Sequence, residues 1–412
     1  MLSQLLKPKN FCDIKRYYAL KKRFVYADNA ATTQPLPEVI DEMMPFLREN
    51  WGNPSSLHKK GTQAKSALDA YREKIAALLD CDKSEMFFTS CGSESDNHAI
   101  RGAAYANASK GKHIITSKVE HHAVLHTCHA LEKEGFEVTY LDVDGEGMVS
   151  AQAVERAIRP DTTLVSIMYA NNEIGTIMPI KEIAAVCRAH GVLCMTDAVQ
   201  AVGSVPISIR ELGVDILTAS GHKIHAPKGI GLLYIKKGKK IANLIEGGGQ
   251  ERGRRGGTEN LPYIAAFSKA LEIAVEKLPD MARVEKLRDR LIEGLLNIPY
   301  SRLNGSREHR LPGNVNISFE FIEGESIVLL MDLAGICCST GSACSSSSLD
   351  PSHVLLAIGL PHEIAHGSVR LTLSHDNTED DVDYIIEKLS GIVEKLREMS
   401  PLYEKCRGTA MM

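Results

Sequence analysis

The hydrophobic positions of the chain change their period repeatedly from about residue 24 onward. Short runs rich in Val, Ile and Leu alternate with segments in which apolar residues recur at helical spacing, which predicts strands alternating with amphipathic helices. The expected strands are residues 85–89, 113–119, 136–142, 162–170, 192–198, 214–219 and 229–236, and the expected helices are residues 58–79, 94–108, 122–134, 150–158 and 179–190. Most of the strands are continuously apolar, which is typical of a mostly parallel sheet covered by helices on both faces. The pattern therefore predicts an α/β fold.

This pattern changes after about residue 275. The expected elements are then a long helix at 264–295, a strand at 314–321, a helix at 324–334, a Ser- and Cys-rich loop at 338–348, a strand at 368–374 and a charged amphipathic helix at 378–399. Fewer strands and more peripheral helices predict a second, smaller α+β domain.

Composition narrows the class of protein. The chain has 412 residues, 44% of them hydrophobic and 24% charged, which is enough to bury the cores of two or three domains. The formal net charge of -4 shows no basic excess of the kind that nucleic-acid binding requires. No apolar run reaches the roughly 18 residues of a membrane-spanning helix. We therefore expect neither nucleic acid nor membrane as a partner.

Cysteines and the N-terminal segment indicate the compartment. Ten cysteines in 412 residues are too dilute for a disulfide framework, and no C-x-x-C pair occurs, which favours a reducing environment. The first 24 residues carry seven Lys/Arg and one acid, Asp13, without the apolar centre of a secretory signal. A solvated basic arm on a cytoplasmic protein is the favoured interpretation, while a transit peptide to an organelle matrix stays open.

Two charged residues follow apolar strands. Lys223 ends the segment 220–223 (SGHK), directly after the strand at 214–219. A partly desolvated Lys there could react as a neutral amine and form an imine, although a surface Lys in a turn is the simpler interpretation. Asp197 lies at the end of the strand at 192–198, where open α/β sheets bind ligands. It could pair with the pyridinium nitrogen of pyridoxal phosphate (PLP), or it could cap a helix.

Two other segments have the character of anion-binding loops. Residues 89–95 (TSCGSES) follow a strand and open a helix, so their amides and hydroxyls could hold a phosphate, as could those of any capped helix. Residues 247–258 form a cationic, Gly-rich segment that suits a phosphate or another subunit, or a mobile surface loop. Phosphate loop, acid and lysine occur in the order that a PLP enzyme would require.

At this point the motifs resemble those of the NifS/IscS-type cysteine desulfurases, which are PLP enzymes similar to the class-V aminotransferases. They are residues 26–33 (YADNAATT), 53–56 (NPSS), 171–175 (NNEIG), 220–223 (SGHK), 250–253 (QERG), 257–258 (GT) and 342–344 (SAC). The resemblance extends from about Phe24 to about Leu396 and is nearer the NifS branch than the housekeeping branch.

The resemblance implies a homodimeric PLP-dependent transferase of fold type I. It implies a large PLP-binding domain at 31–275 and a small domain made of 1–30 and 276–412, which carries the catalytic-cysteine loop at about 338–348. It also implies that L-cysteine is converted to L-alanine while Cys344 takes up the sulfur as a persulfide. A NifU/IscU-like scaffold would then accept this sulfur for iron–sulfur cluster assembly.

Residue roles carry over from the same resemblance. Lys223 would form the imine with the cofactor, His121 would stack over its ring and shuttle protons, and Cys344 would be the nucleophile. The residues that would contact the cofactor are Gly92, Ser93, His121, Asn172, Asp197, Gln200, Ser220, His222, Lys223 and, from the neighbouring subunit, Thr258. Asn172 and Arg370 would bind the substrate carboxylate. No intrinsic metal site is expected, although Cys344 could transiently ligate a cluster shared with the scaffold.

Some residues depart from the housekeeping pattern, and other functions stay open. Cys91 replaces a usual Gly, while Ser93 replaces a usual Thr and keeps the hydroxyl. Cys337 and Cys338 are interpreted as small residues at the end of a buried strand or the start of the loop. Selenocysteine lyase is the nearest alternative activity, followed by an aminotransferase of the same fold. A scaffold protein without catalysis would need neither Lys223 nor Asp197.

Overall fold

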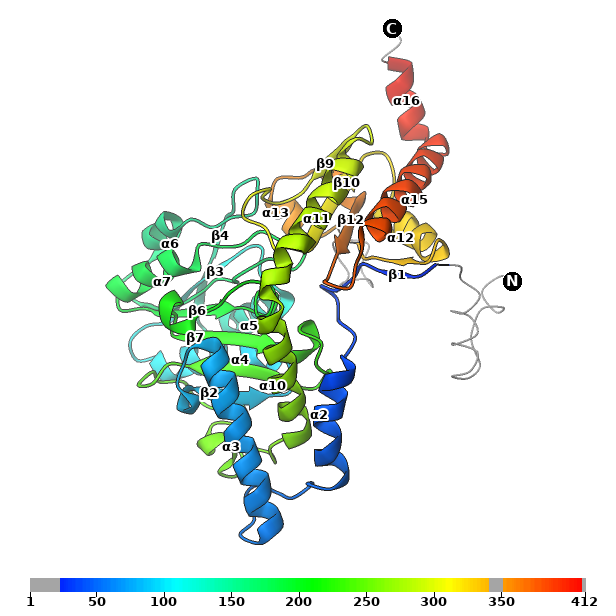
Figure 1. The fold of residues 1–412 in the computed structure, drawn as a ribbon. Coiled ribbons are helices and arrows are strands. Elements are labelled where there is room, and N and C mark those ends of the chain that lie inside the picture. The colour runs from blue at the N-terminus through cyan, green and yellow to red at the C-terminus, as the bar shows by residue number, and fades with distance from the viewer. Residues whose placement is uncertain (1–22, 341–350, 410–412) are drawn as a thin grey trace, which may run out of the picture.

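The computed structural model describes residues 23–340 and 351–409 of the chain (Figure 1). In this part of the chain the largest sheet has seven strands. In spatial order they are β2 (Met86–Thr89), β8 (Gly231–Ile235), β7 (Ile216–Ser220), β6 (Leu193–Asp197), β5 (Thr162–Ser166), β3 (His113–Ser117) and β4 (Glu137–Leu141). Only β8 runs antiparallel to its neighbours, so the expected α/β fold with a mostly parallel sheet is confirmed.

Both faces of this sheet are buried, because successive strand residues point to opposite sides. Ile114 and Leu164 pack into one apolar cluster, whereas the adjacent Ile115 and Val165 pack into another. The first cluster lies under α4 (Gly92–Asn107) and α5 (His122–Glu132). The helices that cover the second cluster are α3 (Lys59–Leu79), α7 (Ile180–Ala189) and α10 (Leu261–Glu276). Continuous apolar strands are the consequence of this two-sided burial.

Helix α2 (Pro37–Arg48) was not expected from the sequence pattern. It packs with α3 along α10, and Figure 1 shows these three long helices side by side. Proline at its first position is compatible with a helix start, because that residue needs no intrahelical N–H bond. The remaining helices of this region are α6 (Ala151–Ala157), α8 (Ile209–Leu212) and α9 (Gln250–Gly253).

A third apolar cluster surrounds a small antiparallel sheet in the order β12 (Ser368–Thr372), β10 (Asn314–Phe319), β9 (Ser301–Leu303). Helices α11 (Met281–Leu296), α12 (Gly324–Leu333) and α15 (Glu379–Glu398) pack around it. Val25 and Ala27 belong to this cluster, and β1 (Val25–Tyr26) pairs in parallel with β11 (Ile336–Cys337). The other elements are α13 (His353–Ala357), α14 (His362–His366) and α16 (Pro401–Thr409).

The single long helix expected at 264–295 is wrong. Helix α10 ends at Glu276, a short 3₁₀ turn (Leu278–Asp280) follows, and α11 begins at Met281. Pro279 lies in the turn and cannot donate a backbone hydrogen bond, so it favours a break at this point. The break separates a helix that packs on the large sheet from one that packs on the small sheet (Figure 1).

Candidate active site

The sequence-predicted site residues come from the carboxyl ends of neighbouring strands. Asp197 is the last residue of β6, and Lys223 ends the 3₁₀ turn (Gly221–Lys223) that follows β7. His121 precedes α5 after β3, and Gly92 opens α4 after β2. Because β2, β3, β6 and β7 run in the same direction, their carboxyl ends meet at one edge of the sheet. The topology thus brings together residues that are far apart in the sequence.

These residues line a cavity of about 390 Å³. Its walls include ten of the predicted cofactor and substrate residues: Gly92, Ser93, His121, Asn172, Asp197, Gln200, Ser220, His222, Lys223 and Arg370. Arg370 is contributed by β12 of the smaller sheet, so the cavity lies where the two sheets approach each other. Their individual roles stay predictions.

The ammonium group of Lys223 is held by two backbone carbonyls. Its Nζ donates to the oxygen of Ala30 at 2.5 Å and to that of Ala31 at 2.9 Å. Gln200 reaches the same wall, since its Nε2 donates to Ala30 at 3.1 Å. The segment around Ala30 therefore sets the position of the amine on which the predicted imine chemistry depends.

Asp197 is one of three buried carboxyl groups close together. Its Oδ1 accepts from the N–H of Val199 at 2.9 Å, and burial raises its pKa to about 6, although the Val199 N–H and the charge of Lys223 favour the ionised form. Burial also raises the pKa of Asp96 well above its usual value, with the charge of Asp197 acting in the same direction. The pKa of Glu120 is raised to about 8 by burial and, to a lesser extent, by Asp197. A cationic ring nitrogen beside Asp197 would relieve this unfavourable burial of negative charge.

Asp96 and Glu120 were not singled out in the sequence analysis. Asp96 Oδ1 accepts from the hydroxyl of Thr218 at 2.6 Å, and Glu120 accepts from the Ser117 hydroxyl at 2.6 Å and from the Met168 N–H. A sequence signal existed for each: Asp96 lies four residues after Gly92 on the same helix, and Glu120 precedes His121. What the sequence could not show is that both side chains are directed inward.

The two histidines of the cavity are held as neutral bases. Burial and the nearby charge of Lys223 lower the pKa of His121 to about 4, and the same two causes lower that of His222 to about 4. His121 Nδ1 accepts a hydrogen bond from the Ala123 N–H at 3.1 Å, which leaves Nε2 to carry the ring proton. A neutral imidazole in this position could give up one proton and accept another.

Arg370 is 3% exposed, and its two Nη atoms each donate one hydrogen bond. Nη1 donates to the backbone oxygen of Asn172 at 2.9 Å and Nη2 to Asp28 Oδ1 at 3.1 Å. Within the described residues its Nε is buried without a hydrogen-bond partner. An unpaired donor on a buried guanidinium is costly, so a carboxylate bound in this cavity would satisfy it.

The start of α4 provides a close approach between segments. A side chain at position 92 would bring its Cβ within 2.9 Å of Val199 and 3.4 Å of Ser220, so only glycine fits without displacement. The first N–H groups of α4 and the hydroxyls of Ser93 and Ser220 thus lie at one end of the cavity. This end suits a phosphate group, while Lys223 and Asp197 suit an aldehyde and a pyridine nitrogen, so the residues present fit PLP.

Among the described residues, one predicted site residue, Thr258, does not line this cavity. Thr258 is exposed and lines a different cavity with Arg255 and Ser90. The Gly-rich segment around it is anchored, because buried Glu251 pairs with Arg72 at 2.8 Å and Arg255 pairs with Glu94 at 2.8 Å. Cys344 and its neighbours in the loop lie outside the described residues.

Comparison with known proteins identifies the family and the fold. The family model "Aminotransferase class-V" matches residues 25–385. The curated protein "Cysteine desulfurase IscS" of Clostridium botulinum is 56% identical over 384 residues, which cover 92% of this chain and 97% of that protein. A solved "NIFS-LIKE PROTEIN" has a TM-score of 0.86 and 41% identity, with 91% of this chain and all of that one covered. "SspA in complex with cysteine" has a TM-score of 0.75 and 38% identity, with 85% of this chain and 98% of that one covered.

The chain therefore belongs to the class-V aminotransferase family and, within it, to the NifS/IscS-type cysteine desulfurases. The predicted family and the fold-type-I architecture are confirmed. The curated relatives are named as cysteine desulfurases, which favours this activity over that of a selenocysteine lyase.

Proposed function

We propose that this protein is a PLP-dependent cysteine desulfurase, which removes sulfur from L-cysteine and releases L-alanine. The observation that carries the proposal is the convergence of Lys223, Asp197 and His121 on one cavity whose wall includes a buried guanidinium with an unpaired Nε. Lys223, Asp197 and His121 would serve a PLP enzyme whatever its amino-acid substrate. The names of the relatives then point to cysteine as the substrate.

The protein's own groups divide the work. Arg370, with the side chain of Asn172, binds the substrate carboxylate and orients the amino acid. When bound, PLP withdraws electrons from the substrate's α-carbon. Asp197 holds the positive charge on the ring nitrogen through its carboxylate. Lys223, once its amine is neutral, and the neutral His121 line the same cavity and would hold the protons that leave and return.

Sulfur leaves the substrate by transfer to the side chain of Cys344. The thiolate of Cys344 attacks the sulfur of the bound cysteine, so that an S–S bond forms while the Cβ–S bond breaks and its electron pair stays on carbon. Protonation of that carbon gives the alanine side chain. The persulfide on Cys344 then passes its outer sulfur to a thiol of an acceptor protein, for which an iron–sulfur scaffold of the NifU/IscU kind is the candidate.

The remaining assignments belong to the same proposal. The protein acts as a homodimer in which Thr258 reaches the phosphate of the neighbouring subunit, and it works in the cytoplasm. In the described part of the chain, no helix has the length and apolar character to cross a membrane. The division into domains at 31–275 and at 1–30 with 276–412 also stays a proposal. Residues 354–365 belong to the small domain in this division, although several of their side chains pack into the core of the large sheet.

The decisive experiment is a stoichiometric assay on the purified holoenzyme. L-Cysteine with a thiol reductant should yield equal amounts of L-alanine and sulfide, and Lys223→Ala should yield neither. L-Selenocysteine as competitor tests the alternative substrate. Formation of a 2-oxo acid in place of alanine would instead identify an aminotransferase and contradict the proposal.

A further inference from the structure

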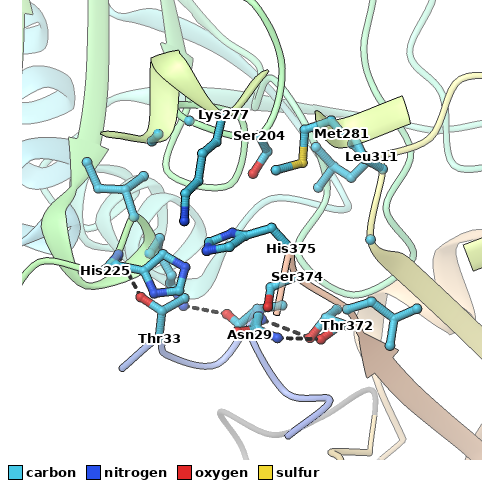
Figure 2. A pocket seen from close by; sticks show the side chains of 18 of the residues that line it. Asn29, Thr33, Ser204, His225, Lys277, Met281, Leu311, Thr372, Ser374 and His375 are labelled. Carbon is cyan, nitrogen blue, oxygen red and sulfur yellow. Dashed lines mark hydrogen bonds between the residues drawn. The ribbon is translucent and has the colours of Figure 1, made fainter. Parts of the chain in front are cut away.

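A second cavity, of about 100 Å³, lies behind the wall that positions Lys223. Ala30, Gln200 and Lys223 line both this cavity and the catalytic one. Its other walls come from both halves of the fold and include Ser204, Leu311 and Ser374 (Figure 2). We call it the rear cavity.

Three basic side chains meet in the rear cavity. Figure 2 shows the ammonium group of Lys277 directed into the space between His225 and His375, whose ring centroids lie 5.2 Å apart. None of the residues that line the cavity is Asp or Glu. Within the described parts of the chain, Lys277 Nζ has no hydrogen-bond or ion-pair partner, and His375 Nε2 is buried without a hydrogen bond. The nearest carboxylate to that nitrogen is Asp376, with its Oδ1 3.5 Å away and outside the cavity lining.

The rest of the lining is aliphatic. Ile273, Met281 and Leu311 contribute to it, and Figure 2 shows Met281 and Leu311 together, on the other side of Ser204 from His225. The volume is about two thirds of the roughly 150 Å³ that accepts a benzene-sized molecule, so a ligand of about four to six heavy atoms fits. The ammonium group of Lys277, a lining that contains no acid and an apolar wall together favour a small anion that has an alkyl part, while Asp376 lies beside His375 outside the lining.

We propose that the rear cavity binds a short-chain monocarboxylate, with the carboxylate between Lys277, His225 and His375 and the alkyl part against Met281 and Leu311. A metal ion is disfavoured, because the Lys277 charge would repel it and the described residues include no group of three or more ligands placed to hold one. A free amino acid is disfavoured because its ammonium group would also face Lys277. The proposal is independent of the proposed desulfurase activity.

Proton uptake should accompany binding. His225 Nδ1 lies 2.9 Å from the backbone oxygen of Gln34, which fixes that nitrogen as the donor and leaves Nε2 unprotonated in the neutral ring. Burial lowers the pKa of His225 and of His375; Lys277 lowers both further, Arg283 lowers that of His375, and Asp376 opposes these effects. A bound carboxylate would offset the charge of Lys277 and raise both pKa values. Affinity should therefore increase as the pH falls.

The test is ligand-observed NMR of propionate with the holoenzyme at pH 6.5 and pH 8. Lys277→Gln should weaken propionate binding by about tenfold or more, which corresponds to 1.4 kcal/mol. Lys286→Gln is the matched control, since Lys286 is exposed on α11 away from the cavity lining. Binding to the parent should be several-fold tighter at pH 6.5 than at pH 8, and propylammonium should not bind.

Arg370→Lys separates the rear cavity from the catalytic one, because Arg370 is the proposed carboxylate-binding residue of the catalytic cavity and does not line the rear cavity. Propionate binding that is lost in Arg370→Lys and unchanged in Lys277→Gln would overturn the proposal. L-Alanine that displaces propionate equally well in the parent and in Arg370→Lys would also overturn it, since a zwitterion would then fit beside Lys277. Unchanged thermal unfolding of Lys277→Gln shows that the variant is folded.

Discussion

Asp28 and Arg370 form an ion pair in the wall of the catalytic cavity, with 3.1 Å between Asp28 Oδ1 and Arg370 Nη2. The other carboxylate oxygen of Asp28 accepts from the Ser339 hydroxyl at 2.9 Å, and Ser339 also pairs with the backbone of Arg370. Asp28 thus fixes the guanidinium from one side and links it to Ser339. Ser339 lies two positions before the undescribed segment at 341–350. The guanidinium is positioned before substrate arrives, which reduces the cost of binding.

Arg370→Lys should raise the KM for L-cysteine about tenfold or more, because a lysine cannot keep Asp28 and Asn172 and also offer a donor to the substrate. We expect kcat to change by less than about threefold, since the group binds and does not transfer protons. Arg302→Lys is the matched control, because Arg302 is exposed on β9, a strand of the same small sheet. Equal KM values for the two variants would refute a carboxylate role for Arg370.

Much of the catalytic edge could be predicted because burial on both faces makes β6 and β7 continuously apolar. Such strands are recognisable in a sequence, so Asp197 at the end of β6 and Lys223 in the turn after β7 stand out. The Pro279 break was missed because apolar residues at helical spacing continue through it on both sides. The spacing of apolar residues shows which face of a helix is buried. It does not show which sheet that face packs against.

The buried carboxyls could not be predicted in the same way. Asp96 lies on a helix, where an acid is usually exposed, and only the packing of α4 against β7 brings it to Thr218. The rear cavity combines His225, Lys277 and His375, which are distant in the sequence and form no motif. Residues that lie close together in space but have no fixed spacing along the chain leave no recognisable pattern in a single sequence.

Asp197→Asn and Asp96→Asn should behave very differently. Loss of the Asp197 charge should reduce kcat/KM by a factor on the order of a hundred or more, because the ring nitrogen loses its counter-charge. Burial raises the pKa of Asp96 well above its usual value and so favours the neutral form, which asparagine matches in shape and charge, so kcat/KM should fall by less than about threefold. Steady-state alanine formation measures both. Similar losses would show that Asp96 is ionised in the working enzyme.

Glu120→Gln should change how stability depends on pH. The folded pKa of about 8 lies above the unfolded value of 4.5, so the fold favours the protonated form. This contribution is complete below about pH 4.5 and is lost as the pH rises towards 8. Between pH 5 and pH 7.5 the free energy of unfolding of the parent should therefore fall relative to Glu120→Gln, by at most about 1.4 kcal/mol per pH unit. Denaturant titrations of the apoprotein at several pH values measure this, with exposed Glu325→Gln as the control. Parallel curves for parent and Glu120→Gln would mean that Glu120 is ionised when buried.

Subunits that carry Lys223→Ala and Thr258→Ala should complement each other. In one chain, Thr258 lies outside the catalytic cavity, so its predicted contact with the phosphate requires a second copy. In a heterodimer one site lacks both residues and the other has both, so about half of the parent activity should return. Differently tagged subunits, purified as verified heterodimers, allow the alanine assay. Activity no higher than that of either parent homodimer would place Thr258 in its own subunit's site, or in none.

Cys344 alone should carry the transferable sulfur. Its sequence neighbours at 341–348 are all small, whereas Cys337 ends β11 and Cys338 packs against the small-sheet core. Burial raises the pKa of the Cys338 thiol to about 12, so it is not a thiolate at neutral pH and is a poor nucleophile.

Cys344→Ala should keep its bound cofactor and the response of its visible spectrum to L-cysteine, because those depend on Lys223. It should accumulate no persulfide and deliver no sulfur to a scaffold protein, while Cys338→Ala should match the parent. Mass spectrometry of peptides after brief exposure to L-cysteine shows which cysteine carries the added sulfur. A one-sulfur adduct on Cys91, Cys337 or Cys338 of the parent, with Cys344 unmodified, would move the nucleophile to that residue.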